Sequence, residues 1–237
     1  MEPLSVICWK WKPPKFYERE FTSDAVNTLY KMVQRNYCHP FRFHCFTDDP
    51  DGIFGGIEVH PIPDDFSNIE SPLGVHYPSC YRRLVAFYPS FADIVGPRFV
   101  SLDLDCVVVD RLEPLWDRRE DMVFWESQVP GQPYNGSMWL HRCGTRERAI
   151  DLFCPTASPE TAKRAGFTGS DQAWLSYILP GEATWDKQDG VMSWQTHCKN
   201  RGWQLPRNSR IVFFQGLDSP WDKRVQDRAR WIKEHYK

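Results

Sequence analysis

The chain has 237 residues, of which 41% are hydrophobic and 25% are charged, and its formal net charge is −2. A chain of this length and composition can bury a large core, which excludes a disordered protein. Acidic and basic residues are scattered along the whole sequence, so the electrostatic footprint of a nucleic-acid-binding protein is missing and no partner follows from net charge.

The first hundred residues alternate between strand and helix patterns. An apolar run over residues 4–9 predicts a strand, which two following prolines end. Apolar residues at helical spacing behind a possible cap predict a helix over residues 23–36. FRFHCF and IEVHPI, residues 41–46 and 57–62, predict two further strands, and residues 79–88 predict a second helix.

This alternation predicts an α/β protein with a mostly parallel central sheet flanked by helices. In such sheets ligands bind beyond the carboxyl ends of the strands, so we expect the site near Trp9, Thr47 and Asp103.

The second half mixes strand and helix patterns, and it contains no repeat, low-complexity tract or linker. We expect a single domain over residues 1–237. The expected elements are strands at 122–125, 137–141 and 210–214, helices at 146–153 and 170–178, and a charged C-terminal helix within 221–237.

The strongest strand pattern, GPRFVSLDLDCVVVD at residues 96–110, contains two carboxylates. In a continuous strand, Asp103 and Asp105 would lie on one face because side chains alternate. Two like charges on a buried strand are costly unless a cation neutralises them, one is protonated, or the strand ends at solvent. Carboxylate oxygens suit Mg²⁺ or Mn²⁺, so the pair predicts a metal or phosphate site, with a solvated pair as the structural alternative.

A phosphatase is a second interpretation of this pair. An Asp-x-Asp after an apolar run also resembles the nucleophile strand of haloacid-dehalogenase-like phosphatases, in which the first aspartate attacks phosphorus. That motif normally opens its fold, whereas Asp103 follows roughly a hundred residues of strand and helix pattern. Position therefore argues against this alternative.

The order of five segments resembles the GT-A glycosyltransferases, and within them family 8, the glycogenin and LgtC type, with related bacterial and phage enzymes. The segments run from about Cys8 to Trp221, and their order and spacing are more specific than any one of them. They are SCYRRLVAF, LDLDCVVVD, YNGSMWLHR, GSDQAWLSYIL and RIVFFQGLDSPWD.

The resemblance implies a nucleotide-binding half at residues 1–110 and a sugar and acceptor half at residues 111–237. It also implies a role for each matching residue. Asp171 and Gln172 are the implied catalytic residues, and they would orient the donor sugar or the acceptor. The implied metal ligands are Asp103, Asp105 and Gln215. The implied donor-binding residues are Trp9, Arg82, Arg83, Leu104, Asn135, Gly136, Ser137 and Gly216.

The implied reaction moves a hexose-type sugar from a nucleotide-diphosphate sugar to an unidentified glycan, lipid or protein acceptor. The resemblance implies that the donor is a UDP-sugar and that the reaction retains the configuration of the anomeric carbon. Mn²⁺ or Mg²⁺ is the implied cofactor. The closing segment departs from the family because Gln215 and Phe213 stand where a histidine ligand is usual, and Ser219 replaces a usual lysine. A nucleotide-sugar-binding protein without activity is therefore a further alternative.

The sequence has no apolar stretch long enough to span a bilayer, and the apolar run near its start is too short for a signal peptide. Its eight cysteines include no C-x-x-C pair, which argues against a cysteine zinc site and favours reduced thiols. We expect a soluble cytoplasmic protein.

Overall fold

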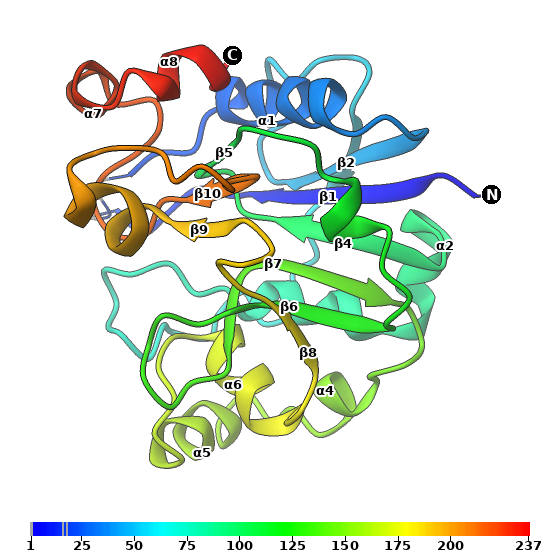
Figure 1. Cartoon of the computed structure of the whole chain (residues 1–237). Coiled ribbons are helices and arrows are strands. Elements are labelled where there is room, and N and C mark those ends of the chain that lie inside the picture. The colour runs from blue at the N-terminus through cyan, green and yellow to red at the C-terminus, as the bar shows by residue number, and fades with distance from the viewer. Residues whose placement is uncertain (1, 16, 18) are drawn as a thin grey trace.

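The computed structural model describes residues 2–15, 17 and 19–237. Within these residues the chain builds a seven-stranded sheet of order β3-β2-β1-β4-β7-β6-β8 (Figure 1). Neighbouring strands are parallel except that β7 is antiparallel to both β4 and β6, which confirms a mostly parallel α/β sheet. The strands are β1 (Leu4–Lys10), β2 (Phe41–Thr47), β3 (Glu58–Pro61), β4 (Arg98–Leu102), β6 (Met122–Glu126), β7 (Tyr134–Arg142) and β8 (Ala183–Trp185).

The same part of the chain also forms a three-stranded sheet of order β5-β10-β9. Its strands are β5 (Cys106–Val108), β9 (Val191–Ser193) and β10 (Ile211–Phe213). Strand β10 is antiparallel to β5 and parallel to β9. This small sheet places the chain that follows β10 beside Asp105, whose carbonyl accepts a hydrogen bond from the Phe214 N–H at 2.8 Å.

The expectation of one continuous strand over residues 96–110 is wrong. The chain leaves the main sheet after β4 and joins the small sheet at β5, and Asp103 and Asp105 lie in the connection. The Asp103 N–H donates to the Ser137 carbonyl at 2.8 Å, while β5 pairs with β10. Because the hydrogen-bonding partners change between the two aspartates, strand alternation does not determine their orientation.

The helices differ from the sequence expectation mainly in length. Helix α1 (Ser23–Asn36) has the expected bounds, whereas the expected helix at 79–88 is the 3₁₀-helix η1 (Tyr81–Phe87). The helix expected at 146–153 is reduced to α4, and the C-terminal helix is split into α7 and α8 by a turn at Ala229, whose φ and ψ are not helical. The other elements are α2 (Ala92–Val95), α3 (Glu113–Trp116), α4 (Arg148–Asp151), α5 (Ser158–Arg164), α6 (Asp171–Ile178), α7 (Lys223–Arg228), α8 (Trp231–His235), 3₁₀-helices η2 (Pro89–Phe91) and η4 (Lys199–Arg201), and the π-helical turn η3 (Trp194–Cys198).

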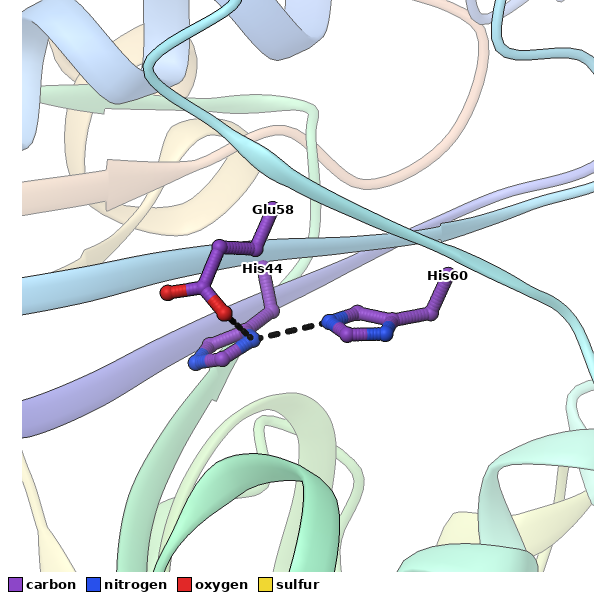
Figure 2. Close-up of side chains that lie close together, drawn as sticks. All are labelled: His44, Glu58 and His60. Carbon is purple, nitrogen blue, oxygen red and sulfur yellow. Dashed lines mark hydrogen bonds and ion pairs between the residues drawn. The ribbon is translucent and has the colours of Figure 1, made fainter.

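The main sheet has a buried core on each face. Along β1, Val6 and Cys8 pack with α1, whereas Ile7 and Trp9 pack with η1 and η2, as strand alternation requires. Figure 1 shows α1 along one face and the segment around α2 on the other. On the η1 face, His44 and His60 lie together at the β2–β3 edge (Figure 2).

In the described residues, no helix combines the length and the apolar character needed to cross a membrane.

Candidate active site

The residues that the sequence singled out come together in one cleft at the carboxyl end of β4. The cleft has a volume of about 480 Å³. Segments separated by up to about two hundred positions in the sequence contribute to it, because the main sheet, the small sheet and the N-terminus of α6 meet there. Its walls include the expected residues Arg83, Asp103, Asp105, Asn135, Gly136, Ser137, Asp171, Gln172 and Gln215.

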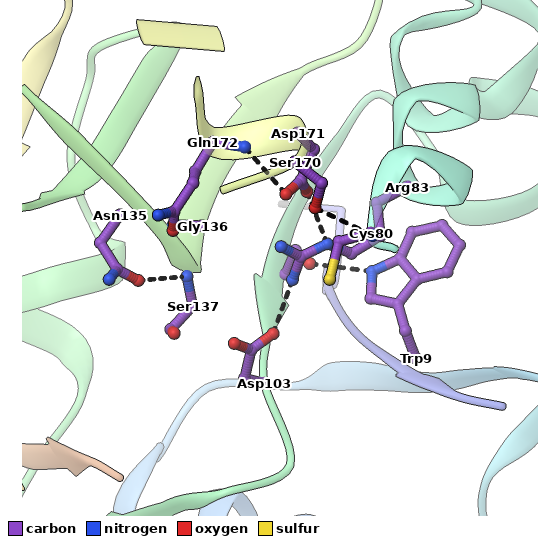
Figure 3. Close-up of polar contacts among 11 residues, drawn as sticks. Trp9, Cys80, Arg83, Asp103, Asn135, Gly136, Ser137, Ser170, Asp171 and Gln172 are labelled. Carbon is purple, nitrogen blue, oxygen red and sulfur yellow. Dashed lines mark hydrogen bonds and ion pairs between the residues drawn. The ribbon is translucent and has the colours of Figure 1, made fainter. Parts of the chain in front are cut away.

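Arg83 lies at the centre of the polar network of this cleft (Figure 3). Its Nε donates to Asp171 Oδ2 at 2.7 Å, and its Nη1 donates to Asp103 Oδ1 at 2.6 Å. The side chain is buried, and burial alone would lower the pKa of the guanidinium, but the two carboxylates outweigh it and hold this pKa well above its ordinary value. Arg83 is therefore a fixed positive charge beside the Asp-x-Asp connection.

Gly136 allows β7 to approach this arginine. A Cβ atom at position 136 would lie 2.6 Å from Arg83 Nη2, closer than real contacts allow. The Gly136 N–H also donates to Gln172 Oε1 at 3.2 Å. A glycine is needed here because the backbone itself forms the wall of the arginine site.

Asp171 and Gln172 begin helix α6, and they have different surroundings. Asp171 is 2% exposed, and burial raises the pKa of its carboxyl, with Arg83 opposing that shift. Its Oδ1 accepts from the Gln172 N–H at 2.8 Å. One oxygen of Asp171 accepts from Arg83 and the other accepts from a backbone N–H, so Asp171 orients the arginine. Gln172 instead contributes its amide to the cleft wall.

Asn135 and Ser137 flank Gly136 on β7. The Asn135 Oδ1 accepts from the Ser137 N–H at 2.8 Å, which fixes the amide at the cleft wall. The Ser137 carbonyl in turn accepts from the Asp103 N–H, so β7 holds the Asp-x-Asp connection through its backbone.

Arg19 is a residue of this site that the sequence reasoning missed. Its Nη2 pairs with Asp105 Oδ2 at 2.8 Å, its Nη1 donates to the Gly216 carbonyl at 3.0 Å, and its Nε donates to Ser219 Oγ at 3.0 Å. Burial raises the pKa of Asp105 to about 6, although Arg19 opposes this shift. Arg19 thus joins the Asp-x-Asp connection to the segment after β10.

A sequence signal for Arg19 existed. It is a basic residue in the connection that follows the first strand, and ligands of α/β sheets bind at that end of the strands. No spacing pattern in residues 11–22 selects it over Lys12 or Lys15, so only the structure identifies it.

The expected metal ligands form a donor set that fits a hard divalent cation. Arg83 uses one oxygen of Asp103, and Figure 3 shows the second oxygen turned away from the guanidinium. Gln215 lines the same cleft, and its Oε1 accepts from the Ser193 hydroxyl at 2.9 Å. Carboxylate and amide oxygens that themselves accept hydrogen bonds are ordinary Mg²⁺ or Mn²⁺ ligands, although two arginines neutralise the carboxylates here.

Three expected donor-binding residues have other surroundings. Arg82 lies outside the cleft, in a separate depression with Trp11. Trp9 is mainly a core residue, since it is 6% exposed, stacks on Phe46 at 4.8 Å and donates its indole N–H to Ser101. Gly216 is exposed and has a φ of 83°, and it holds Arg19 through its carbonyl.

Two further cavities adjoin the cleft. A narrow recess of about 150 Å³ shares Arg83, Asp103 and Asp105 with it and has mostly aromatic and apolar walls, which include Trp9, Trp11, Tyr17, Phe21 and Leu104. A groove of about 1040 Å³ shares Gln128, Val129 and Thr196 with the cleft. The recess and the groove therefore border the cleft at different residues, and only the recess shares the two aspartates with it.

No protein-family model and no curated protein matches this sequence. Solved structures do match. The galactosyltransferase LgtC, in complex with donor and acceptor sugar analogues, is 14% identical with a TM-score of 0.62 over 99% of this chain and 97% of that chain. An active-site mutant of LgtC has 14% identity and a TM-score of 0.61, covering 98% of this chain and 94% of that chain.

The glycosyltransferase GlyE of Streptococcus pneumoniae TIGR4 is also similar. It is 13% identical with a TM-score of 0.58, covering 97% of this chain and 60% of that chain. The chain therefore has the GT-A fold, a Rossmann-like α/β architecture, of the LgtC type, as the resemblance in sequence implied.

Proposed function

We propose that this protein is a glycosyltransferase that moves a hexose-type sugar from a nucleotide-diphosphate sugar to a glycan, lipid or protein acceptor. The observation that carries the proposal is the pair of buried arginines, Arg19 and Arg83, bound to Asp105 and Asp103 in the cleft of a GT-A fold. If a divalent cation took over the two carboxylates, both arginines would remain as fixed positive charges, which would suit a ligand that gains negative charge as it reacts.

The departing diphosphate is such a ligand. It must accept charge as the anomeric bond breaks, and preorganised positive groups stabilise that charge without reorganising. Arg83, held by Asp171, and Arg19, held by Ser219, are preorganised in this sense. We assign both residues to leaving-group stabilisation.

A divalent cation, Mn²⁺ or Mg²⁺, would be held by Asp103, Asp105 and Gln215. When bound, such an ion acts as a Lewis acid on the two phosphates. Metal binding would weaken the Arg19–Asp105 pair, so we expect a low metal affinity and a smaller metal requirement than the donor set alone suggests.

We assign each part of the substrates to one of the three cavities according to the residues in its walls. The recess with Trp11 and Tyr17 has the aromatic walls that suit a base, and uridine is our choice because of the likeness to family 8. Asn135, Ser137 and Gln172 would contact the donor sugar, and the groove beyond Val129 would take the acceptor. We also propose that the reaction retains the configuration of the anomeric carbon, and the same likeness to family 8 supports this choice.

A nucleotide-sugar-binding protein without turnover is the second candidate. One observation favours it: both carboxylates are already neutralised by arginines, and the Gln215 oxygen is already bound by Ser193.

The phosphatase alternative is disfavoured by the position of the Asp-x-Asp motif. In haloacid-dehalogenase-like phosphatases this motif normally opens the fold, whereas here Asp103 follows the fourth strand of a GT-A fold.

The test is to incubate purified protein with a panel of nucleotide sugars and Mn²⁺ and to measure release of the nucleoside diphosphate. Asp105→Ala and an EDTA control test the site, and Asp151→Ala, at an exposed position of α4, is the matched control. Turnover of one donor that is lost in Asp105→Ala and kept in Asp151→Ala supports the proposal. Donor binding without turnover supports the second candidate, and phosphate release from simple phosphoesters contradicts both.

A further inference from the structure

A second group of chemically suited side chains lies at the β2–β3 edge of the main sheet. His44 of β2 is paired in register with Glu58 of β3, and Phe46 with His60. Residues two apart in a strand share a face, so His44, Glu58 and His60 point to the same side of the sheet. Figure 2 shows their polar atoms converging, and one ligand atom from each lies within 4.8 Å of the others.

The hydrogen bonds of Ser5 determine which nitrogen of His44 carries the proton. The Ser5 hydroxyl donates to the Val95 carbonyl, so its oxygen accepts from His44 Nε2 at 3.1 Å. In a neutral imidazole, Nδ1 is then unprotonated, with its lone pair directed away from Ser5. This Nδ1 lies 3.0 Å from His60 Nε2 and 3.7 Å from Glu58 Oε2.

The charge states suit a cation. Burial lowers the pKa of His44 to about 4 and also lowers the pKa of His60, so both imidazoles are neutral at pH 7. The hydrogen bond from Arg42 lowers the pKa of Glu58, which is therefore ionised. Neutral imidazoles and a carboxylate are the protonation states in which these groups bind metals.

We propose that His44, Glu58 and His60 form a zinc site that clamps the edge strand β3 to β2. Two imidazoles and one carboxylate are a common zinc ligand set. Ligand atoms about 2.0–2.1 Å from a tetrahedral ion lie roughly 3.4 Å from one another. This separation falls between the 3.0 Å from His44 Nδ1 to His60 Nε2 and the 3.7 Å from His44 Nδ1 to Glu58 Oε2. The ligands also have outer partners, since Ser5 accepts from His44 and Arg42 donates to both oxygens of Glu58.

Arg42 lowers the affinity of this site, because its positive charge competes with the ion for Glu58. We therefore expect weaker binding than that of a closed structural zinc site. Binding would stabilise β3 and the segment that follows it, which reaches the catalytic cleft at Ser71, Leu73 and Tyr77. The zinc site is independent of the proposed glycosyl transfer.

The test uses full-length protein with Asp103→Asn and Asp105→Asn, so that the catalytic carboxylates do not compete for metal. After treatment with a chelator, this protein is titrated with Zn²⁺ by calorimetry, and Co²⁺ serves as a spectroscopic probe of a tetrahedral site. We expect one equivalent of zinc to bind. His60→Ala and Glu58→Gln should each weaken it at least tenfold, whereas His39→Ala, at an exposed histidine paired with Asp117, should not.

Glu58→Gln preserves the packing of the strand edge, so it keeps the test valid if His60→Ala destabilises the fold. No stoichiometric zinc binding, or binding that survives both substitutions, would overturn the proposal. The histidines would then have only a structural role, through the hydrogen bonds of His44 with His60 and Ser5.

Discussion

Arg82 and Arg83 are adjacent in the sequence, and their surroundings differ completely. Arg83 is buried and bridges Asp103 and Asp171, whereas Arg82 is half-buried and lies outside the cleft. The motif SCYRRLVAF indicated both arginines as donor-binding residues, because a sequence does not tell which side of a short 3₁₀-helix faces the site. The same limit applies to Trp9, whose side chain packs in the core.

Substitution of each arginine by lysine tests this difference. Lysine cannot donate in two fixed directions, so Arg83→Lys should lose the bridge and lower kcat/KM by about 10²-fold. Arg82→Lys should stay within about threefold of the wild type, because nothing in the cleft depends on it. Steady-state kinetics with the identified donor measure both, with thermal unfolding as the folding control. Equal losses in the two variants would contradict the assignment of Arg83.

At the scale of elements, the site depends on close approaches between segments that are distant in the sequence. Strand β7 approaches η1 so closely that only glycine fits at Gly136, and β10 approaches the Asp-x-Asp connection through the Phe214 N–H. The period-2 pattern of residues 96–110 predicted strand residues correctly on both sides of the aspartates. It did not predict the break, because apolar alternation is the same whether a strand continues or passes to a second sheet.

Gly136→Ala should therefore damage both the site and the packing around it. The added Cβ would contact Arg83, which cannot move away because Asp103 and Asp171 hold it. We expect at least a tenfold loss of donor affinity and a loss of unfolding free energy of about 1–3 kcal/mol from overpacking. Gly55→Ala is the matched control, because a Cβ there would meet no atom within 4 Å. Donor titration and urea unfolding give the two quantities, and unchanged donor affinity in Gly136→Ala would refute the argument.

At the scale of the whole molecule, each face of the main sheet buries a large core, and the core on the η1 face contains ionisable groups. His141 on β7 is fully buried beside Phe87, with ring centroids 4.8 Å apart. Burial lowers the pKa of His141 to about 3. The folded state therefore keeps this imidazole neutral at a pH where the unfolded chain binds a proton.

This difference predicts a specific loss of stability in acid. Below the unfolded pKa of about 6.5 the unfolded state binds more protons, so His141 lowers the unfolding free energy as pH falls, by up to about 1.4 kcal/mol per pH unit. The effect should end near the folded pKa of about 3. Between pH 5 and 6, the unfolding free energy of His141→Phe should therefore change less with pH than that of the wild type, by up to about 1.4 kcal/mol per pH unit. Urea unfolding in EDTA at several pH values measures it, and identical slopes would disprove the assignment.

The sequence alone determined the α/β class, the position of α1 and most strands, because these features depend on local periodicity. The Asp-x-Asp pair was identified by its own chemistry, and the other segments that build the cleft were identified by the resemblance to the GT-A glycosyltransferases. Only the tertiary structure decided that Asp103 and Asp105 lie between two sheets, that Arg83 rather than Arg82 reaches them, and that Arg19 pairs with Asp105 across the cleft. These features depend on contacts between segments far apart in the chain, and no local pattern specifies such contacts.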